Sequence, residues 1–304
     1  MLLAGALCLS CSGDEDGADA LPSTPPAETK PTDGQQGTGE PPLHEIDSLE
    51  VWCTGHEGLK IYGKLFFPKG NDKALPAVIL SHSHSLTNAG MRGDARLIAE
   101  QGFAAYCFDF CGACDGSKST GRSTDEMTVF TEVEDLRAVV AMVKQQDYVD
   151  SSRVVLLGSS QGGLVSAILA EQLQDAVASM VLFYPAFNIP ELVKMFAGLG
   201  GGSWGNGSWG GMMSISEKFV NTIKDYDVWS NIGTFSRPVC IVHGTSDFIV
   251  PISNSEKAVQ LYPHAELHPI QGANHGFNDA NLGGMGSIMG GQTDYDDQVV
   301  PVVL

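Results

Sequence analysis

Short, continuous runs of apolar residues alternate with segments of helical spacing through most of this chain, and this alternation restricts the fold more than any other feature. Apolar runs that fit strands occupy residues 77–80, 103–108, 154–157, 180–183 and 239–242, and a last strand is expected at 265–269. Helices are expected between them at residues 91–101, 132–145, 164–173 and 255–262. Strands that are apolar at every position are buried on both faces, and their alternation with helices is typical of parallel sheets. The sequence therefore predicts an α/β domain.

Two further strands are expected ahead of this alternation, at residues 51–54 and 59–67. The short turn His56-Glu57-Gly58 separates them, and the second begins with alternating apolar and polar residues, as a half-exposed strand does. Strands joined by so short a turn pair in antiparallel fashion. The expected sheet is therefore eight-stranded, mostly parallel and flanked by helices, with an antiparallel pair at one edge.

Residues 187–236 interrupt this alternation and contain a glycine-rich stretch at 198–213. A long excursion from a compact domain is usually a lid or a binding loop. We expect it to form a small cap insertion within a single domain at residues 48–304. Its apolar side chains are candidates for the wall of a substrate pocket: Trp204, Trp209, Met212 and Phe219. The alternative is that these side chains only pack the cap onto the body of the domain.

The segment 12–47 is rich in Pro, Gly, Thr and acidic residues and has few large apolar side chains. Such a composition cannot bury enough surface to offset the entropy of ordering, which predicts a flexible tether. The segment also carries part of the net charge of −19. We do not expect a nucleic-acid partner, because phosphate binding needs clustered Lys and Arg and the sequence has no basic stripe.

The first eleven residues resemble the signal segment of a bacterial lipoprotein. Residues 1–10 are mostly apolar and too few to span a bilayer as a helix. In Cys8-Leu9-Ser10-Cys11 a small residue precedes a cysteine, as at a lipoprotein processing site, and the acidic residues that follow resemble the export signal of Bacteroidetes-type surface lipoproteins. The resemblance implies export, lipidation at Cys11 and contact with a membrane only through that anchor. An ordinary chain terminus is the alternative.

The seven cysteines do not have the spacing of a disulfide framework or of a zinc site. Cys107 and Cys240 lie within apolar runs and are expected to be buried as small hydrophobic residues. Cys111 and Cys114 form a C-x-x-C pair, which a redox or metal function would explain. A loop after a strand is the interpretation we favour, because no second Cys or His pair stands at zinc spacing. We expect no metal ion and no cofactor.

The pattern G-x-S-x-G occurs twice, centred on Ser160 and on Ser203. A serine nucleophile in this pattern needs a sharp turn between a strand and a helix, with backbone N–H groups nearby. Ser160 meets this condition, because it follows the strand expected at 154–157 and precedes the helix expected at 164–173. Ser203 lies in the glycine-rich stretch with no strand before it. Ser160 is therefore the candidate nucleophile.

An acid and a base follow Ser160 in the expected order. Asp247 comes directly after the strand at 239–242, and His275 comes after the strand at 265–269. Residues at the carboxyl ends of parallel strands gather at one edge of the sheet, where ligands bind. A serine hydroxyl becomes a good nucleophile when a histidine removes its proton, and an aspartate orients that histidine and stabilises its charged form. We assign Ser160, Asp247 and His275 as a catalytic triad.

These residues, in this order, resemble the α/β-hydrolase superfamily from about residue 48 onward. Four segments are similar to the bacterial esterase branch that includes cinnamoyl and feruloyl esterases: 80–82, 107–112, 134–136 and 184–187. The resemblance implies an oxyanion hole formed by the backbone N–H groups of His84 and Gln161. Ser83 stands where that branch has glycine, which would strain the turn if a positive φ is needed there. His82 would then brace the loop.

The resemblance implies that the chain cleaves carboxylic esters of short-chain or hydroxycinnamoyl type through an acyl-Ser160 intermediate, with a small ester as partner. Three alternatives stay open. An oligopeptidase has the same elements, usually after a large β-propeller domain, whereas a tether precedes the fold here. An acyltransferase or thioesterase would form the same acyl-enzyme with another acceptor or thioester substrate. A non-catalytic binding lipoprotein would keep only the fold.

Overall fold

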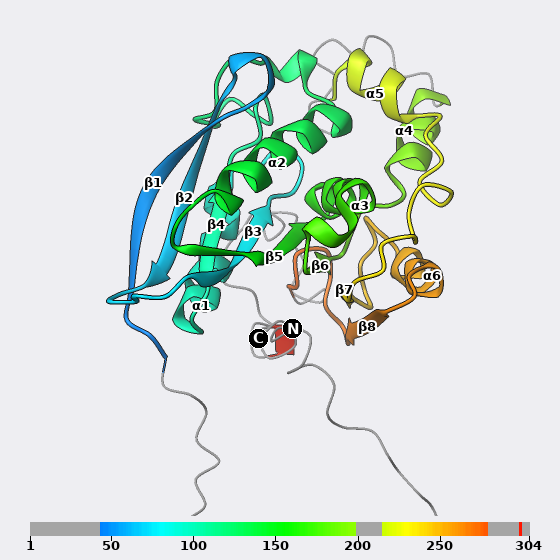
Figure 1. The fold of residues 1–304 in the computed structure, drawn as a ribbon. Coiled ribbons are helices and arrows are strands. Elements are labelled where there is room, and N and C mark those ends of the chain that lie inside the picture. The colour runs from blue at the N-terminus through cyan, green and yellow to red at the C-terminus, as the bar shows by residue number, and fades with distance from the viewer. Residues whose placement is uncertain (1–42, 199–214, 279–297, 300–304) are drawn as a thin grey trace, which may run out of the picture.

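The protein folds around one eight-stranded sheet in the computed structural model, which describes residues 43–198, 215–278 and 298–299. Its strands are β1 (Ile46–Thr54), β2 (Lys60–Pro68), β3 (Leu75–Ser81), β4 (Ala104–Phe108), β5 (Val149–Ser159), β6 (Ser179–Phe183), β7 (Val239–Gly244) and β8 (Ala265–Ile270). They lie in the order β1-β2-β4-β3-β5-β6-β7-β8, as Figure 1 shows. β1 and β2 are antiparallel to their neighbours, and β3 to β8 are parallel. The predicted sheet is confirmed.

Six α-helices accompany the sheet within the described residues: α1 (Arg92–Glu100), α2 (Val129–Lys144), α3 (Gln161–Leu173), α4 (Ile189–Gly198), α5 (Glu217–Ile223) and α6 (Ser253–Leu261). Each helix expected from the sequence is present. α2 begins three residues earlier than expected because Thr128 caps it, accepting the Thr131 N–H at 3.1 Å while the Thr131 hydroxyl oxygen accepts the Thr128 N–H at 2.8 Å.

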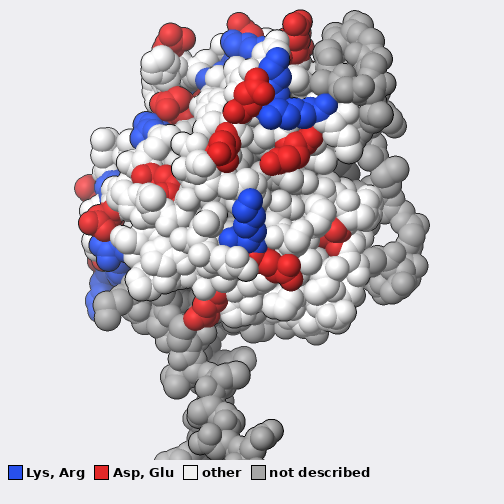
Figure 2. Space-filling model, turned by 90° about the vertical axis from the view of Figure 1, so that its right-hand side faces the viewer, with Lys and Arg blue, Asp and Glu red and all other residues white. Residues whose placement is uncertain are grey.

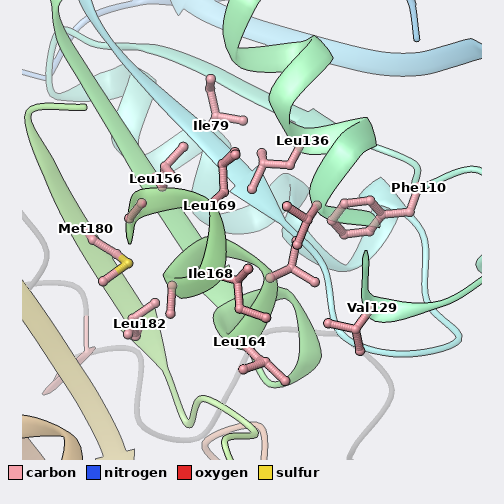
Figure 3. Packing of buried hydrophobic residues seen from close by; sticks show 14 of the residues in the cluster. Ile79, Phe110, Val129, Leu136, Leu156, Leu164, Ile168, Leu169, Met180 and Leu182 are labelled. Atoms are coloured by element: carbon pink, nitrogen blue, oxygen red, sulfur yellow. The ribbon is translucent and has the colours of Figure 1, made fainter. Parts of the chain in front are cut away.

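Two layers of apolar side chains cover the faces of the sheet. On one face Leu136 of α2 and Leu169 of α3 pack in the same cluster as Ile79 of β3, as Figure 3 shows. The neighbouring strand residues Val78 and Leu80 belong to the cluster on the other face, which α1 covers. Successive strand residues point to opposite faces, so both faces need an apolar cover. This is why the strands read as continuous apolar runs.

The described part of the interrupting segment 187–236 contains α4 and α5, which pack against each other. α5 also contacts α2 and the 3₁₀ helix η3 (Thr124–Glu126). In Figure 1 the two helices lie together beyond the edge of the body formed by α2, α3 and the sheet. Both helices contribute side chains to the pocket beside Ser160: Ile189, Leu192 and Val193 from α4, and Phe219 from α5.

The surface in Figure 2 carries Lys and Arg side chains interspersed with Asp and Glu side chains. The described residues on this face form no extended basic stripe. In addition, none of the helices within the described ranges is both long enough and apolar enough to cross a bilayer.

Candidate active site

Ser160 lies at the sharp turn between β5 and α3, with φ 51° and ψ −116°. Its N–H donates to Phe183 O of β6 at 2.9 Å, which fixes the turn above the sheet. The flanking glycines are required by close approach of backbone atoms. A Cβ at Gly158 would lie 2.3 Å from Gly162 O, and a Cβ at Gly162 would lie 2.3 Å from Ser81 O. This is the strained strand-to-helix turn that presents a serine nucleophile.

The structure brings together the three residues assigned as a triad. His275 Nε2 lies 3.0 Å from Ser160 Oγ, and His275 Nδ1 lies 2.7 Å from Asp247 Oδ2. All three side chains are buried. Both distances allow direct hydrogen bonds, so a proton can pass from the hydroxyl to the imidazole without an intervening group.

Close contact between the loops that follow β7 and β8 places the acid beside the base. Ser246 N–H donates to Ala273 O at 2.9 Å. A Cβ at Gly244 would lie 2.2 Å from Ala273 O, so only glycine allows this approach. The two loops are neighbours because β7 and β8 pair in parallel, and their carboxyl ends therefore meet at one edge.

Asp247 is held as a carboxylate. Its Oδ1 accepts the N–H groups of Ile249 and Val250, each at 2.9 Å, and its Oδ2 accepts from His275 and His243. Burial by itself would raise the pKa of Asp247, but the hydrogen bonds of His243 and His275 outweigh it and hold the pKa at about 2. The ionised oxygen accepts the Nδ1–H of His275. This leaves the Nε2 lone pair for the Ser160 hydroxyl.

His243, at the end of β7, is a second histidine on the acid and was not assigned from the sequence. Its Nε2 lies 3.2 Å from Asp247 Oδ2 and 2.8 Å from Val250 O, and its Nδ1 lies 2.6 Å from Ser255 Oγ. Two acceptors at Nε2 require a proton there, and the Ser255 hydroxyl holds the other ring nitrogen. The signal in the sequence was a histidine inside a buried strand, four residues before the acid.

Aromatic rings support His275 from the side. The Tyr184 ring lies 4.6 Å from the His275 ring, and the Phe277 ring lies 4.8 Å from the Tyr184 ring. Tyr184 and Phe277 both have positive φ, at 36° and 58°. These conformations are unusual for bulky residues, and tertiary packing holds them at the site.

The residues assigned to the oxyanion hole lie next to each other. Gln161 is the first residue of α3, and the N–H groups of a first helical turn have no acceptor within the helix. His84 lies in the loop after β3, and its Nδ1 lies 3.0 Å from Gln161 Oε1. His82 is the brace that the sequence predicted, because its Nε2 accepts the Phe110 N–H at 3.2 Å.

The expected strain at Ser83 is not found. The described non-glycine residues with positive φ include Ser85, at 56°, and do not include Ser83. Ser83 instead uses its hydroxyl, which lies 3.0 Å from Ser159 Oγ beside the nucleophile. A glycine is therefore not needed at this position.

A pocket with a cavity volume of about 50 Å³ opens beside the nucleophile. Its lining residues come from the body of the domain and from the interrupting segment: His84, Ser160, Gln161, Ala186, Ile189, Leu192, Val193, Ile215, Phe219, Ile249 and Val250. Phe219 thus lies where the sequence analysis expected a pocket residue. The other pocket candidates, Trp204, Trp209 and Met212, lie outside the described residues, as does Cys11.

Neither cysteine of the C-x-x-C pair belongs to the triad or lines the pocket. Cys111 is buried, and burial raises the pKa of its thiol to about 12, which keeps it protonated. Cys111 and Cys114 are both free thiols. Within the described residues, no group of three His, Cys, Asp or Glu side chains is arranged to hold a metal ion.

The sheet order, the strand-to-helix turn at Ser160 and the hydrogen-bonded serine, histidine and aspartate define an α/β-hydrolase fold with a site of the serine-hydrolase type. A comparison with protein families then identifies the family. The chain belongs to the prolyl oligopeptidase family, whose model matches residues 90–283.

Known proteins similar to the chain include both esterases and peptidases. The structure of Est1E from Butyrivibrio proteoclasticus with bound ferulic acid is 25% identical and has a TM-score of 0.64, covering 74% of this chain and 90% of that one. This similarity confirms the predicted resemblance to bacterial α/β-hydrolases of the esterase type.

Two curated relatives match shorter regions. An uncharacterised 31.7 kDa protein of Escherichia coli is 30% identical over 119 residues, which are 38% of this chain and 40% of that protein. The acylamino-acid-releasing enzyme of Sus scrofa is 26% identical over 122 residues, which are 39% of this chain and 16% of that enzyme. The chain thus spans less than half the length of the curated relatives it matches.

Proposed function

We propose that the protein is a serine hydrolase that cleaves carboxylic esters through an acyl-Ser160 intermediate. One observation carries this proposal: the hydrogen-bonded chain from Ser160 through His275 to Asp247 opens on a mainly apolar pocket. A nucleophile with its base and orienting acid supplies the chemistry of acyl transfer. The apolar lining supplies a place for the acyl group.

Acylation begins when Ser160 Oγ attacks the ester carbonyl carbon and His275 Nε2 takes the hydroxyl proton. The carbonyl electron pair moves to oxygen, and the N–H groups of Gln161 and His84 donate to this oxyanion. Asp247 stabilises the imidazolium, because it is ionised and bonded to Nδ1. The carbon–oxygen bond to the alcohol then breaks, and the alcohol leaves with the proton from Nε2.

Deacylation repeats these steps with water. His275 Nε2 takes a proton from the water as its oxygen attacks the acyl carbon of acyl-Ser160. The second tetrahedral oxyanion uses the same two N–H donors. Its collapse breaks the bond to Ser160 Oγ, which recovers a proton from His275, and the carboxylic acid leaves.

The pocket supports a short acyl group. Its cavity volume is about 50 Å³, and it lies directly beside Ser160. Eight of its eleven lining residues are apolar, and the remaining three are His84, Ser160 and Gln161. We infer that acetyl to butyryl esters fit best. Hydroxycinnamoyl esters are the second candidate, because the similar Est1E structure holds ferulic acid.

The test is hydrolysis of p-nitrophenyl acetate, p-nitrophenyl butyrate, p-nitrophenyl decanoate and methyl ferulate by wild type and Ser160→Ala. We expect wild-type kcat/KM to be highest for acetate or butyrate, and Ser160→Ala to lose activity by roughly 10⁶-fold, as removal of a serine nucleophile does. Equal activity of the two proteins would refute the esterase proposal. A preference for the decanoate would refute the short acyl group.

Peptidase activity is a second candidate, which the family membership and the acylamino-acid-releasing relative favour. The acyl-enzyme is the same, and His275 would protonate a leaving amine in place of an alcohol. Comparison of N-acetyl-alanine p-nitroanilide with p-nitrophenyl acetate separates the two. An amide kcat/KM that equals or exceeds the ester value would assign the protein as a peptidase.

Two further alternatives differ in the acceptor or in the absence of chemistry. A transferase would pass the acyl group to an added alcohol in preference to water, and a thioesterase would favour an acyl thioester over the matching ester. A binding protein that keeps only the fold would turn over none of these substrates. Product analysis with methanol or an acyl thioester in the same assay distinguishes these cases from an esterase.

A further inference from the structure

A buried chain of side chains connects α2 with both residues of the oxyanion hole. Gln161 Nε2 donates to Glu132 Oε2 at 2.8 Å, and Gln161 Oε1 accepts from His84 Nδ1 at 3.0 Å. All three side chains are buried: Glu132 is 1% exposed, Gln161 is 2% exposed and His84 is 8% exposed. Both hydrogen bonds are thus shielded from water. The loss of a buried hydrogen bond costs more free energy than the loss of one at the surface.

We propose that Glu132 is a positioning residue for the oxyanion hole, acting through the side chain of Gln161 on His84. This inference rests on the proposed function, because it assigns a task to a residue behind the same site. The carboxyl group accepts from the NH₂ of Gln161, which turns the amide oxygen toward His84. The amide oxygen then accepts the Nδ1–H of His84 and fixes that ring.

The consequence for catalysis comes from the backbones of the same two residues. Gln161 N–H is anchored at the start of α3, but His84 lies in a loop without regular secondary structure. The side-chain hydrogen bond from His84 to Gln161 therefore holds one donor of the oxyanion at a fixed place relative to the other. Displacement of such a donor by about 1 Å can cost roughly 100-fold in rate.

Glu132 can do this without a charge. Burial is the main cause that raises the pKa of Glu132 to about 8. The hydrogen bond from Gln161 lowers this pKa, the Asp135 carboxylate raises it, and the Arg122 guanidinium lowers it. Arg122 pairs with Asp135 at 2.7 Å, so its charge is already engaged. A neutral carboxyl still accepts the Gln161 N–H. It adds no negative charge behind an oxyanion that forms nearby.

The experiment is a double-mutant cycle with Glu132→Leu and Gln161→Met, assayed for kcat and KM on p-nitrophenyl acetate. Both changes keep the side-chain size and remove hydrogen bonds. We expect each to lower kcat by roughly 10- to 100-fold with a small effect on KM, because the bonds serve the transition state. The two losses should not multiply in the double variant, since both break one chain.

Two controls separate positioning from general packing. Glu132→Gln keeps the shape of the side chain and an acceptor for Gln161, so it should retain kcat within about threefold of wild type. Glu134→Leu changes an exposed glutamate on the same helix and should leave kcat unchanged. If Glu132→Leu does not fold, Gln161→Met alone carries the test.

Wild-type kcat in Glu132→Leu or in Gln161→Met would overturn the inference. So would multiplying losses in the double variant, or a Glu132→Gln that is as poor as Glu132→Leu. None of these results would affect the proposed function, which is tested separately by Ser160→Ala and by the comparison of substrates. The two failures are therefore distinguishable in one set of assays.

Discussion

At the level of single residues, Asp247 accepts hydrogen bonds from two histidines, one of which is the base His275. Asp247 Oδ2 accepts from His275 at 2.7 Å and from His243 at 3.2 Å, and His243 is held in turn by Ser255. The shorter bond sets the tautomer of His275. The longer one keeps the carboxylate from turning away, because His243 is fixed at both ring nitrogens.

Asp247→Asn tests the role of this carboxylate. An amide cannot stabilise the imidazolium, and its NH₂ can force the wrong tautomer on His275. We expect kcat for p-nitrophenyl acetate to fall by roughly 10³- to 10⁴-fold, with a folded protein by circular dichroism. A loss below tenfold in folded protein would remove Asp247 from the triad.

The raised pKa of Glu132 has a consequence for stability. Its pKa is 4.5 in an ordinary environment and about 8 in the fold, so the folded state retains a proton that the unfolded state releases. The contribution of Glu132 to the free energy of unfolding is therefore fully present below pH 4.5 and is lost as the pH rises to about 8. Between these two pH values the free energy of unfolding falls by about 1.4 kcal/mol per pH unit for one proton.

Glu132→Gln should remove this slope, because its amide does not titrate. We expect urea unfolding to give wild type a larger fall in stability than Glu132→Gln between pH 5 and pH 8. The other titrating groups are common to both proteins and cancel in the difference. Parallel curves for the two proteins would mean that Glu132 is already ionised in the fold at pH 5.

At the scale of elements, the strands and helices were predictable because burial on two faces leaves a continuous apolar pattern. The bounds of the helices were less predictable, since α2 starts at a cap made by Thr128 and α3 starts at the turn that holds Ser160. The place of Glu132 behind the site could not be predicted from the sequence for a related reason. Glu132 is a polar residue at a buried position of α2, and its partner Gln161 is 29 residues away in sequence.

Gly162→Ala tests the close packing of the turn. A Cβ there would lie 2.3 Å from Ser81 O, a backbone atom that cannot move aside easily. We expect a loss of at least about 2 kcal/mol in stability together with a loss of activity. Gly93→Ala on α1 is the matched control, because a Cβ at Gly93 meets nothing within 4 Å. It should be neutral or stabilise by up to about 1 kcal/mol.

The result is read from thermal unfolding of the three proteins. A Gly162→Ala protein that melts with wild type would show that the turn can relax. It would also weaken the argument that glycine at this position is dictated by the approach of β3 to α3.

At the scale of the whole molecule, the parallel sheet gathers residues that are far apart in the chain. Ser160 and His275 are 115 positions apart and are hydrogen-bonded. The sequence predicted this meeting, because the carboxyl ends of parallel strands lie at one edge of the sheet. It did not predict which pocket residues converge, because the packing of α4 and α5 against the body depends on contacts that no local pattern encodes.

The membrane anchor is a separate prediction for the whole chain. If Cys11 is lipidated, the full chain expressed in a Bacteroidetes-type host should be found in the membrane fraction. Cys11→Ala should then move it out of that fraction with unchanged esterase activity, since an acyl anchor acts through buried hydrocarbon and not through the fold. Identical fractionation of the two proteins would contradict the lipoprotein interpretation.

The most direct test of the central claim is covalent labelling of the folded protein with a fluorophosphonate probe, followed by mass spectrometry of the labelled peptide. A serine activated by His275 at 3.0 Å should react, whereas an ordinary serine hydroxyl does not. We expect one label, on Ser160, and no label in Ser160→Ala. Folded wild-type protein that stays unlabelled, or that is labelled at another serine, would contradict it.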